Sequence, residues 1–274
     1  ISIVFDIVKK EKWLTAIAIF GTSGILSNPI GSFLSEQVAK YFGNQNLFLL
    51  SLCFVVVYAI LLIFLKVPES EFHKTESKSF FDIIKRKEIK QIILFAIIFG
   101  GAFSVYASFI PNLSKEKLKV ALLSAYFIPF ATTTLTIRFF FSWIFDKIKL
   151  ELLIAISYFF IFLSTVFILF LNSFIILIFV GICYGIGHSI LYPTVGTMFV
   201  NLGKPEEKEI LNNTFAALHT FGSVFIATLL GIIGDIFGIS SIFVGLLVLT
   251  MITLIYSIYY LKRRDNRSLS GYFF

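Results

Sequence analysis

The fold is decided by the stretch Gly181-Ile182-Cys183-Tyr184-Gly185-Ile186-Gly187-His188-Ser189-Ile190-Leu191-Tyr192-Pro193-Thr194. It lies in an apolar run from about residue 174 to residue 199, long enough to cross the roughly 30 Å hydrocarbon core of a bilayer as a helix. Its glycines allow close helix packing, and its proline predicts a bend. Polar groups at membrane depth are costly unless they face protein or water. We therefore predict that one face lines an internal cavity. The alternative is a helix buried among others, with its polar atoms satisfied by neighbours.

The composition places the whole chain in a membrane. Of its 274 residues, 58% are hydrophobic, 14% are charged and 35 are phenylalanine, and the mean hydropathy is +0.93. A soluble domain cannot bury that much apolar surface, and continuous apolar runs do not fit the alternating pattern of an outer-membrane barrel. The net charge of +7 reflects lysines in loops rather than nucleic-acid binding. Cys53 and Cys183 both fall in apolar runs, so neither a disulfide nor a metal site is expected.

Eight apolar segments follow one another along the chain, and they predict an all-α polytopic protein with eight transmembrane helices. They cover residues 12–38, 47–65, 91–113, 120–144, 152–171, 174–200, 210–236 and 239–261. The expected organisation is two helices in 1–65, a cytoplasmic linker in 66–90, six helices in 91–264 and a tail in 265–274.

Basic residues indicate the orientation. Nineteen of the 23 lysines and arginines fall on one side of the predicted helices, and the other side holds Lys40, Lys115, Lys117 and Lys119. Cytoplasmic loops of membrane proteins are rich in lysine and arginine. We therefore expect a multi-pass protein of the inner (plasma) membrane with both ends of this chain and the linker in the cytoplasm. Within the linker, Ser79-Phe-Phe-Asp-Ile-Ile-Lys85 predicts either a short amphipathic helix on the membrane surface or a plain solvated segment.

An internal repeat links the first and seventh predicted helices. Glu11-Lys12 and Glu207-Lys208 precede them, and both exits spell Phe-Gly-x-x-x-x-Phe, from Phe42 and from Phe237. Six predicted helices separate the two copies. A six-helix period predicts that the first unit is represented by its last two helices, with four helices missing upstream.

Several motifs resemble those of the major facilitator superfamily. Arg138-Phe-Phe-Phe-Ser142-Trp-Ile-Phe-Asp146-Lys147-Ile-Lys149 is similar to the family's loop motif Arg-x-x-x-Gly-x-x-x-Asp-Arg-x-Gly-Arg, although Ser142 replaces a glycine, Lys147 an arginine, and the second glycine is absent. The charged segment from Asp6 to Lys12, which precedes a glycine-bearing helix, is also typical of this family. The run from Gly185 to Pro193 is typical of it too and resembles bacterial sugar or drug efflux permeases.

The resemblance implies two six-helix bundles around a central cavity that opens alternately to either side. This chain would supply helices five to twelve and lack the first four. The first, fourth, seventh and tenth helices line the cavity in that family, so 91–113 and 174–200 are expected to do so here. The substrate-cavity candidates are Ser104, Tyr106, Ser108, Asn112, Tyr184, His188, Ser189 and Tyr192. For a lone serine or threonine, a bond back to its own helix is the more common arrangement.

Two further roles are assigned to charged or titratable side chains. His188 and His219 are candidates for proton coupling, because an intramembrane histidine titrates near neutral pH; the alternative is a packed structural residue. The resemblance implies that Arg138, Asp146, Lys147 and Lys149 form charge pairs that close a cytoplasmic gate; ordinary positive-inside anchoring is the alternative. No catalytic, metal-ligand or phosphate-loop spacing occurs, so neither an enzyme nor a cofactor is expected.

The sequence thus predicts a secondary transporter that moves a small solute by alternating access, with the lipid bilayer and protons as its other expected partners. Gly21 to Gly31 faintly resembles a glycine-proline motif of drug/proton antiporters, which favours export. The rival hypothesis is a transport-incompetent fragment or scaffold that keeps the fold. With two of four lining helices, the 274 residues alone are expected not to transport.

The orientation can be tested by cysteine labelling in intact cells. Single cysteines at the outside positions should react with a membrane-impermeant thiol reagent, whereas cysteines at Lys78 and Lys204 should not. The outside positions are Asn44, Lys117, Asn172 and Ile239. The parent chain, with Cys53 and Cys183, gives the background signal. Labelling at Lys78 or Lys204 from outside would contradict the orientation.

Overall fold

The computed structural model describes residues 13–64, 80–119, 124–145, 147–204 and 207–270, and every regular element in them is a helix. This confirms the predicted all-α fold. The chain divides into two compact units, Ile1–Glu76 and Ser77–Phe274, which are described separately.

The first unit contains a helical hairpin. α2 (Trp13–Phe42) and α3 (Asn46–Phe64) are joined at Gly43, whose φ is +82°. Gly238, which joins α10 to α11 in the second unit, has a φ of +87°. Glycine adopts this left-handed region without the steric cost that other residues incur, so the two repeated Phe-Gly patterns end their helices with similar backbone conformations.

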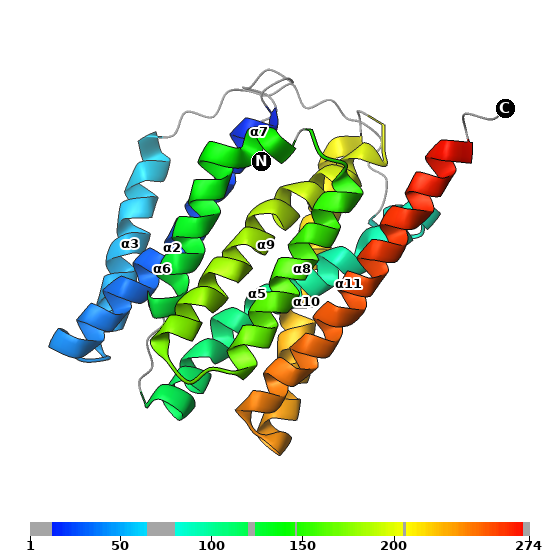
Figure 1. Ribbon diagram of the computed structural model, residues 1–274. Coiled ribbons are helices and arrows are strands. Elements are labelled where there is room, and N and C mark those ends of the chain that lie inside the picture. Colours follow the sequence, from blue (N-terminus) through cyan, green and yellow to red (C-terminus); the bar gives the residue numbers. More distant parts are fainter. Residues whose placement is uncertain (1–12, 65–79, 120–123, 146, 205–206, 271–274) are drawn as a thin grey trace. The chain divides into compact units, whose positions relative to one another are not determined.

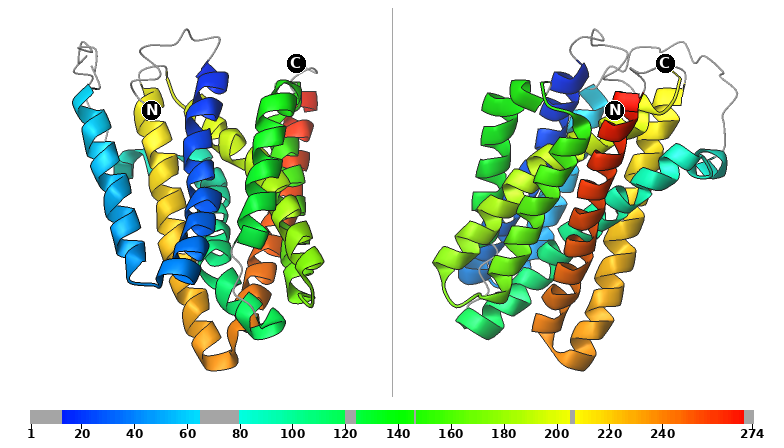
Figure 2. Two further views of the ribbon diagram at one scale, coloured as in Figure 1. Left: turned by 90° about the vertical axis from the view of Figure 1, so that its left-hand side faces the viewer. Right: turned by 45° about the vertical axis from the view of Figure 1, so that its right-hand side comes forward.

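The second unit is a bundle of helices (Figures 1 and 2). α9 lies between α6 and α8, α5 lies along α10, and α11 packs on α8, α10 and α5. The bounds are α4 (Phe80–Ile84), α5 (Lys87–Leu118), α6 (Ser124–Thr136), the π-helix η2 (Ile137–Phe141), α7 (Ser142–Phe145), α8 (Leu150–Leu169), α9 (Phe174–Asn201), α10 (Lys208–Phe237) and α11 (Ile239–Ser270).

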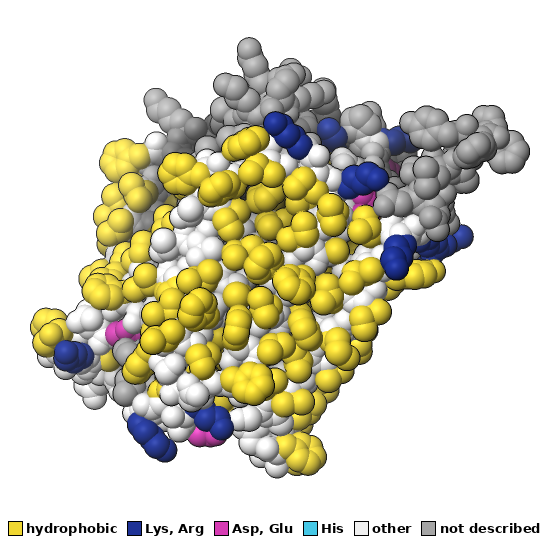
Figure 3. Space-filling view, in the orientation of Figure 1, with side chains coloured by type: hydrophobic (Ala, Val, Ile, Leu, Met, Phe, Trp, Pro, Cys, Tyr) yellow, Lys and Arg dark blue, Asp and Glu magenta, His cyan; other side chains and the backbone are white. Residues whose placement is uncertain are grey.

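Six helices in the described residues are long and apolar enough to cross a membrane: α3, α5, α8, α9, α10 and α11. The first predicted span corresponds to α2, and the fourth is divided among α6, η2 and α7, each shorter than a bilayer needs. The total of eight spans therefore stays a prediction. Hydrophobic side chains dominate the face in Figure 3, with lysines and arginines toward its edges. Such a surface belongs in a bilayer.

Glycines bring α5 and α10 into backbone contact. A Cβ on Gly222 would collide with the backbone of Ile97, and one on Gly100 with the backbone of His219. The Ser223 hydroxyl bridges the same place, lying 3.0 Å from both the Gly100 and His219 carbonyl oxygens. Close approach through small residues is the usual means of helix association in membranes. This contact fixes His219 beside α5.

The glycines of α9 pack this helix on two sides. A Cβ on Gly181 or Gly185 would meet the backbone of α6, at 2.6 Å from the Tyr126 oxygen and 2.8 Å from the Phe130 oxygen. A Cβ on Gly187 would lie 2.7 Å from the Ser157 oxygen of α8. Pro193 lies inside a continuous helix. The close packing predicted from these glycines is therefore found.

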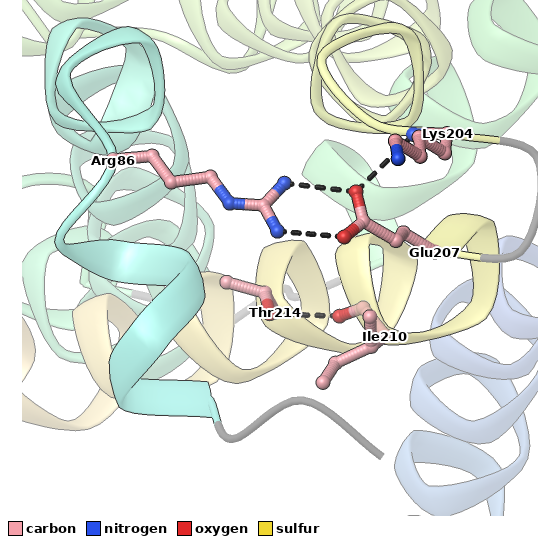
Figure 4. Close-up of polar contacts among 5 residues, drawn as sticks. All are labelled: Arg86, Lys204, Glu207, Ile210 and Thr214. Carbon is pink, nitrogen blue, oxygen red and sulfur yellow. Dashed lines mark hydrogen bonds and ion pairs between the residues drawn. The ribbon is translucent and has the colours of Figure 1, made fainter. Parts of the chain in front are cut away.

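An ion pair fastens the start of α5 to the start of α10 (Figure 4). Arg86 donates to both carboxylate oxygens of Glu207, from Nη1 at 2.9 Å and from Nη2 at 2.8 Å. The Lys204 backbone N–H donates to the same carboxylate at 3.2 Å. The hydrogen bonds that Arg86 donates to the Glu207 carboxylate raise the pKa of Arg86 above its ordinary value. A bidentate pair fixes both distance and orientation, so it sets the register of the two helices.

Gly222→Ala should destabilise the protein by roughly 1–3 kcal/mol, because the added methyl group forces α5 and α10 apart. Gly196→Ala is the matched control, since its nearest neighbour, the Phe215 ring, lies at an ordinary 3.6 Å. Thermal unfolding of both variants in detergent measures the difference. Equal melting temperatures would contradict the close contact at Gly222.

The Arg86–Glu207 pair should show a coupling free energy of roughly 1–2 kcal/mol in a double-mutant cycle, because its bidentate bonds are partly shielded from water. The variants are Arg86→Gln, Glu207→Gln and the double substitution, compared by unfolding in detergent. Lys85→Gln removes a neighbouring exposed charge and should have little effect. Additive single effects would show that the pair does not stabilise the bundle.

Candidate functional site

The centre of the bundle holds a cluster of aromatic and imidazole rings around His188 of α9. The His188 ring lies 5.1 Å from the Phe99 ring and 5.6 Å from the Phe103 ring, both on α5, and 5.2 Å from the Phe130 ring on α6. Tyr184, one turn earlier on α9, lies at 5.9 Å. Three helices therefore enclose His188, and its side chain is 6% exposed.

His219 of α10 joins the same cluster. Its ring lies 4.9 Å from Phe99, 6.3 Å from Tyr192 and 6.2 Å from Phe215. The glycine contact between α5 and α10 places His219 there. Phe99 thus touches both histidines, which come from helices that are separate in the sequence. His219 and Tyr192 are half-buried, so the cluster reaches the surface of the unit.

Arg138 enters the cluster from the π-helix η2. It is 7% exposed, and its guanidinium carbon lies 5.8 Å from the centre of the Tyr192 ring. π-helical turns often occur at functional sites. Cation–π contact supports the arginine. No described residue forms an ion pair or hydrogen bond with it.

Four buried side-chain atoms among the described residues lack a hydrogen-bond partner: Arg138 Nε, Tyr184 Oη, His188 Nδ1 and His219 Nε2. Buried polar atoms are normally paired, because leaving one unpaired costs roughly 1–3 kcal/mol. All four belong to the ring cluster. We therefore take Arg138, Tyr184, His188, Tyr192 and His219 as the candidate site, called the polar cluster below.

Other predicted cavity residues are placed differently. The Tyr106 hydroxyl donates to Ser164 Oγ at 3.0 Å and lies 3.0 Å from Thr165 Oγ1, so α8 satisfies it. Ser189 bonds back to the Ile186 carbonyl of its own helix at 2.8 Å, which fits the structural alternative. Ser104 is half-buried, whereas Ser108 and Asn112 are exposed on α5. The Tyr106 ring contacts Tyr184 of the polar cluster at 4.5 Å, whereas no contact with the cluster is described for the other four residues.

The structure describes three of the four predicted gate residues. The Arg138 guanidinium lies over the Tyr192 ring, Lys147 is exposed with its Nζ 4.7 Å from the centre of the Trp143 ring, and Lys149 precedes α8. Asp146 lies outside the described residues. The gate formed by all four residues therefore stays a prediction.

The sequence pattern did not single out the phenylalanine rings or the convergence of the two histidines. Phe99, Phe103 and Phe130 belong to helices rich in phenylalanine, so composition gave no signal for them. No group of three or more His, Cys, Asp or Glu residues that could hold a metal occurs in the described part of the chain. The chemistry available here is hydrogen bonding, proton exchange at imidazole and attraction of negative charge to Arg138.

Comparisons with known proteins give the family. A search of curated protein sequences finds no match. Among solved structures, the chain resembles the Major Facilitator Superfamily transporter FucP in the outward conformation, with a TM-score of 0.56 and 17% identity over 90% of this chain and 65% of that one. It also resembles a variant of the E. coli fucose:proton symporter FucP, with a TM-score of 0.52 and 18% identity over 89% of this chain and 65% of that one.

At such low identity these likenesses show the fold alone, and the chain spans about two thirds of the length of FucP. The family model described as Major Facilitator Superfamily matches residues 1–186 and 155–271, which together take in nearly all of the sequence. These findings confirm a multi-pass membrane protein with a transporter fold. The chain belongs to the Major Facilitator Superfamily.

Proposed function

We propose that this chain belongs to a secondary transporter that moves a small solute across a membrane by alternating access. The observation that carries the proposal is the polar cluster, where four buried polar atoms lack partners inside an otherwise apolar bundle. A solute or water that enters the site would supply those partners. Polar groups buried in a membrane bundle usually mark a transport pathway.

Proton coupling through His188 is the second part of the proposal. The titratable or charged groups around its ring are Tyr184 and Tyr192 of α9, His219 of α10 and Arg138 of η2, while α5 and α6 contribute phenylalanines. A closed, dry cluster disfavours a second positive charge near Arg138. Opening to water would allow His188 to take a proton, and closure without a negative partner would release it. The cycle of access would thus move protons together with solute.

The location and direction of transport extend the sequence predictions. We place the protein in the inner (plasma) membrane with the linker in the cytoplasm, on the distribution of lysine and arginine. The export motif Gly21 to Gly31 lies in α2, and the side chains of Asn28 and Pro29 are outside the described residues. Reversing the pH gradient in the assay below distinguishes export from uptake.

His188→Gln should uncouple transport from a pH gradient while the protein still folds, because glutamine keeps a hydrogen-bonding side chain but cannot take up the proton. Proteoliposomes containing a pH-sensitive dye, challenged with labelled sugars and organic acids under inward and outward gradients, measure both fluxes. Thr194→Val is the control, since the Thr194 hydroxyl donates to the Ile190 carbonyl of its own helix.

A folded His188→Gln protein with the wild-type response to the gradient would reduce His188 to a structural residue. The flux assay uses the transporter to which this chain belongs, because the 274 residues alone are expected not to transport. Absence of any saturable flux in that unsubstituted transporter, with the full set of solutes and either gradient, would contradict the transport proposal itself.

A further inference from the structure

Arg138 carries a charge that nothing in the described structure neutralises. Its guanidinium is always protonated in proteins, and it is 7% exposed. The ion pairs Arg86–Glu207 and Lys117–Glu116 do not involve Arg138, and its Nε is buried without a partner among the described residues. An isolated buried charge is strongly unfavourable unless a counter-charge reaches it.

We propose that the polar cluster binds an organic anion, a monocarboxylate with a ring or apolar body, whose carboxylate is held by Arg138. This rests on the proposed function and names the class of solute. One guanidinium matches one negative charge, and its planar fork suits a carboxylate. Arg138 Nε is buried without a partner, so a strong donor is available to the ligand.

The surroundings of Arg138 explain why the body of the solute is a ring or an apolar group. The Tyr192 ring lies under the guanidinium, and its phenylalanine neighbours are Phe99 at 6.2 Å and Phe215 at 5.4 Å. Aromatic rings pack against apolar groups and against the faces of other rings. His219, whose ring lies 6.3 Å from the Tyr192 ring, has its Nε2 unpaired and would bind the second carboxylate oxygen.

The contact with α9 fixes the direction of the Arg138 side chain. The guanidinium lies over Tyr192 of α9, which is a neighbour of both histidines. Arg138 is therefore directed to the ring cluster, where an anion would have to enter the bundle.

The bound anion would also change the proton affinity of His188. With Arg138 alone nearby, protonation adds a second positive charge to a buried site. A carboxylate on Arg138 cancels that repulsion, so the anion and the proton favour each other's binding. This coupling is reciprocal by linkage. The pair enters as a neutral unit, which lowers the cost of burial.

Binding is measured on the purified chain in detergent by thermal unfolding with increasing ligand. The probe is benzoate, with uncharged benzamide of the same shape as control. We expect benzoate to raise the melting temperature and benzamide not to do so. Arg138→Gln should weaken the benzoate effect roughly tenfold or more, and Arg138→Lys should keep part of it. Lys87→Gln removes an exposed charge at the start of α5 and should bind like the parent.

Two further measurements distinguish an anion-binding role of Arg138 from a purely structural one. Without ligand, Arg138→Gln should melt no lower than the parent, because it removes an unpaired buried charge; a lower melting temperature would mean that Arg138 has a structural partner and would overturn the proposal. Benzoate should bind more tightly at about pH 6 than at about pH 8, and His188→Gln should remove that difference. Equal binding at both pH values in the parent would overturn the coupling.

Failure of this proposal is distinguishable from failure of the proposed function. If benzoate does not shift the melting temperature, or if benzamide shifts it equally, the anion site is wrong while transport of another solute stands. If benzoate binds through Arg138 but no flux is found in proteoliposomes of the transporter to which this chain belongs, the anion site stands and the transport proposal fails.

Discussion

The structure depends on one constraint: the hydrocarbon core of a bilayer offers no hydrogen-bond partner, so every polar group must find one inside the protein. Many serine and threonine hydroxyls of the bundle find a partner in their own helix. Ser157, Thr194 and Thr250 each donate to the carbonyl four residues earlier on their own helix. Such bonds require no neighbouring helix, which leaves helix faces free to pack by shape. The apolar faces that remain are therefore positioned by side-chain size rather than by polar contacts.

Small residues then decide which helices meet. At Gly100 and Gly222 the backbones of α5 and α10 come into contact, and Gly181 and Gly185 do the same for α9 and α6. Without a hydrophobic driving force between helices in lipid, close packing is a main source of association. Gly100 contacts the backbone of His219 itself. The contact that joins α5 and α10 therefore also places the His219 side chain in the ring cluster. Packing and the candidate site thus have a common origin.

The helices were predictable from the sequence, because apolar length alone determines a membrane span. The segment predicted as 47–65 is α3, Asn46–Phe64, and the one predicted as 174–200 is α9, Phe174–Asn201. Which helices would meet was not predictable, since apolar length carries no information about neighbours. The π-helix at Arg138 has no local sequence signal, and the pair of Arg86 and Glu207 joins residues 121 positions apart. Three-dimensional packing supplies that information.

In the polar cluster, unlike the rest of the described bundle, buried polar atoms have no hydrogen-bond partner among the described residues. Elsewhere even long polar side chains are satisfied across helices: Tyr158 donates to the Phe95 carbonyl at 2.6 Å and Tyr106 to Ser164 of α8. Tyr184 lies among the same rings, yet its hydroxyl has no partner, and neither do Arg138 Nε and the buried ring nitrogens of the two histidines. The bundle is thus able to satisfy tyrosine hydroxyls, and the unpaired polar atoms are concentrated at one place.

A concentration of unpaired polar atoms affects the free energy of binding. A site that is unsatisfied when empty gains free energy on binding, and that gain is what alternating access needs to favour one conformation when loaded and another when empty.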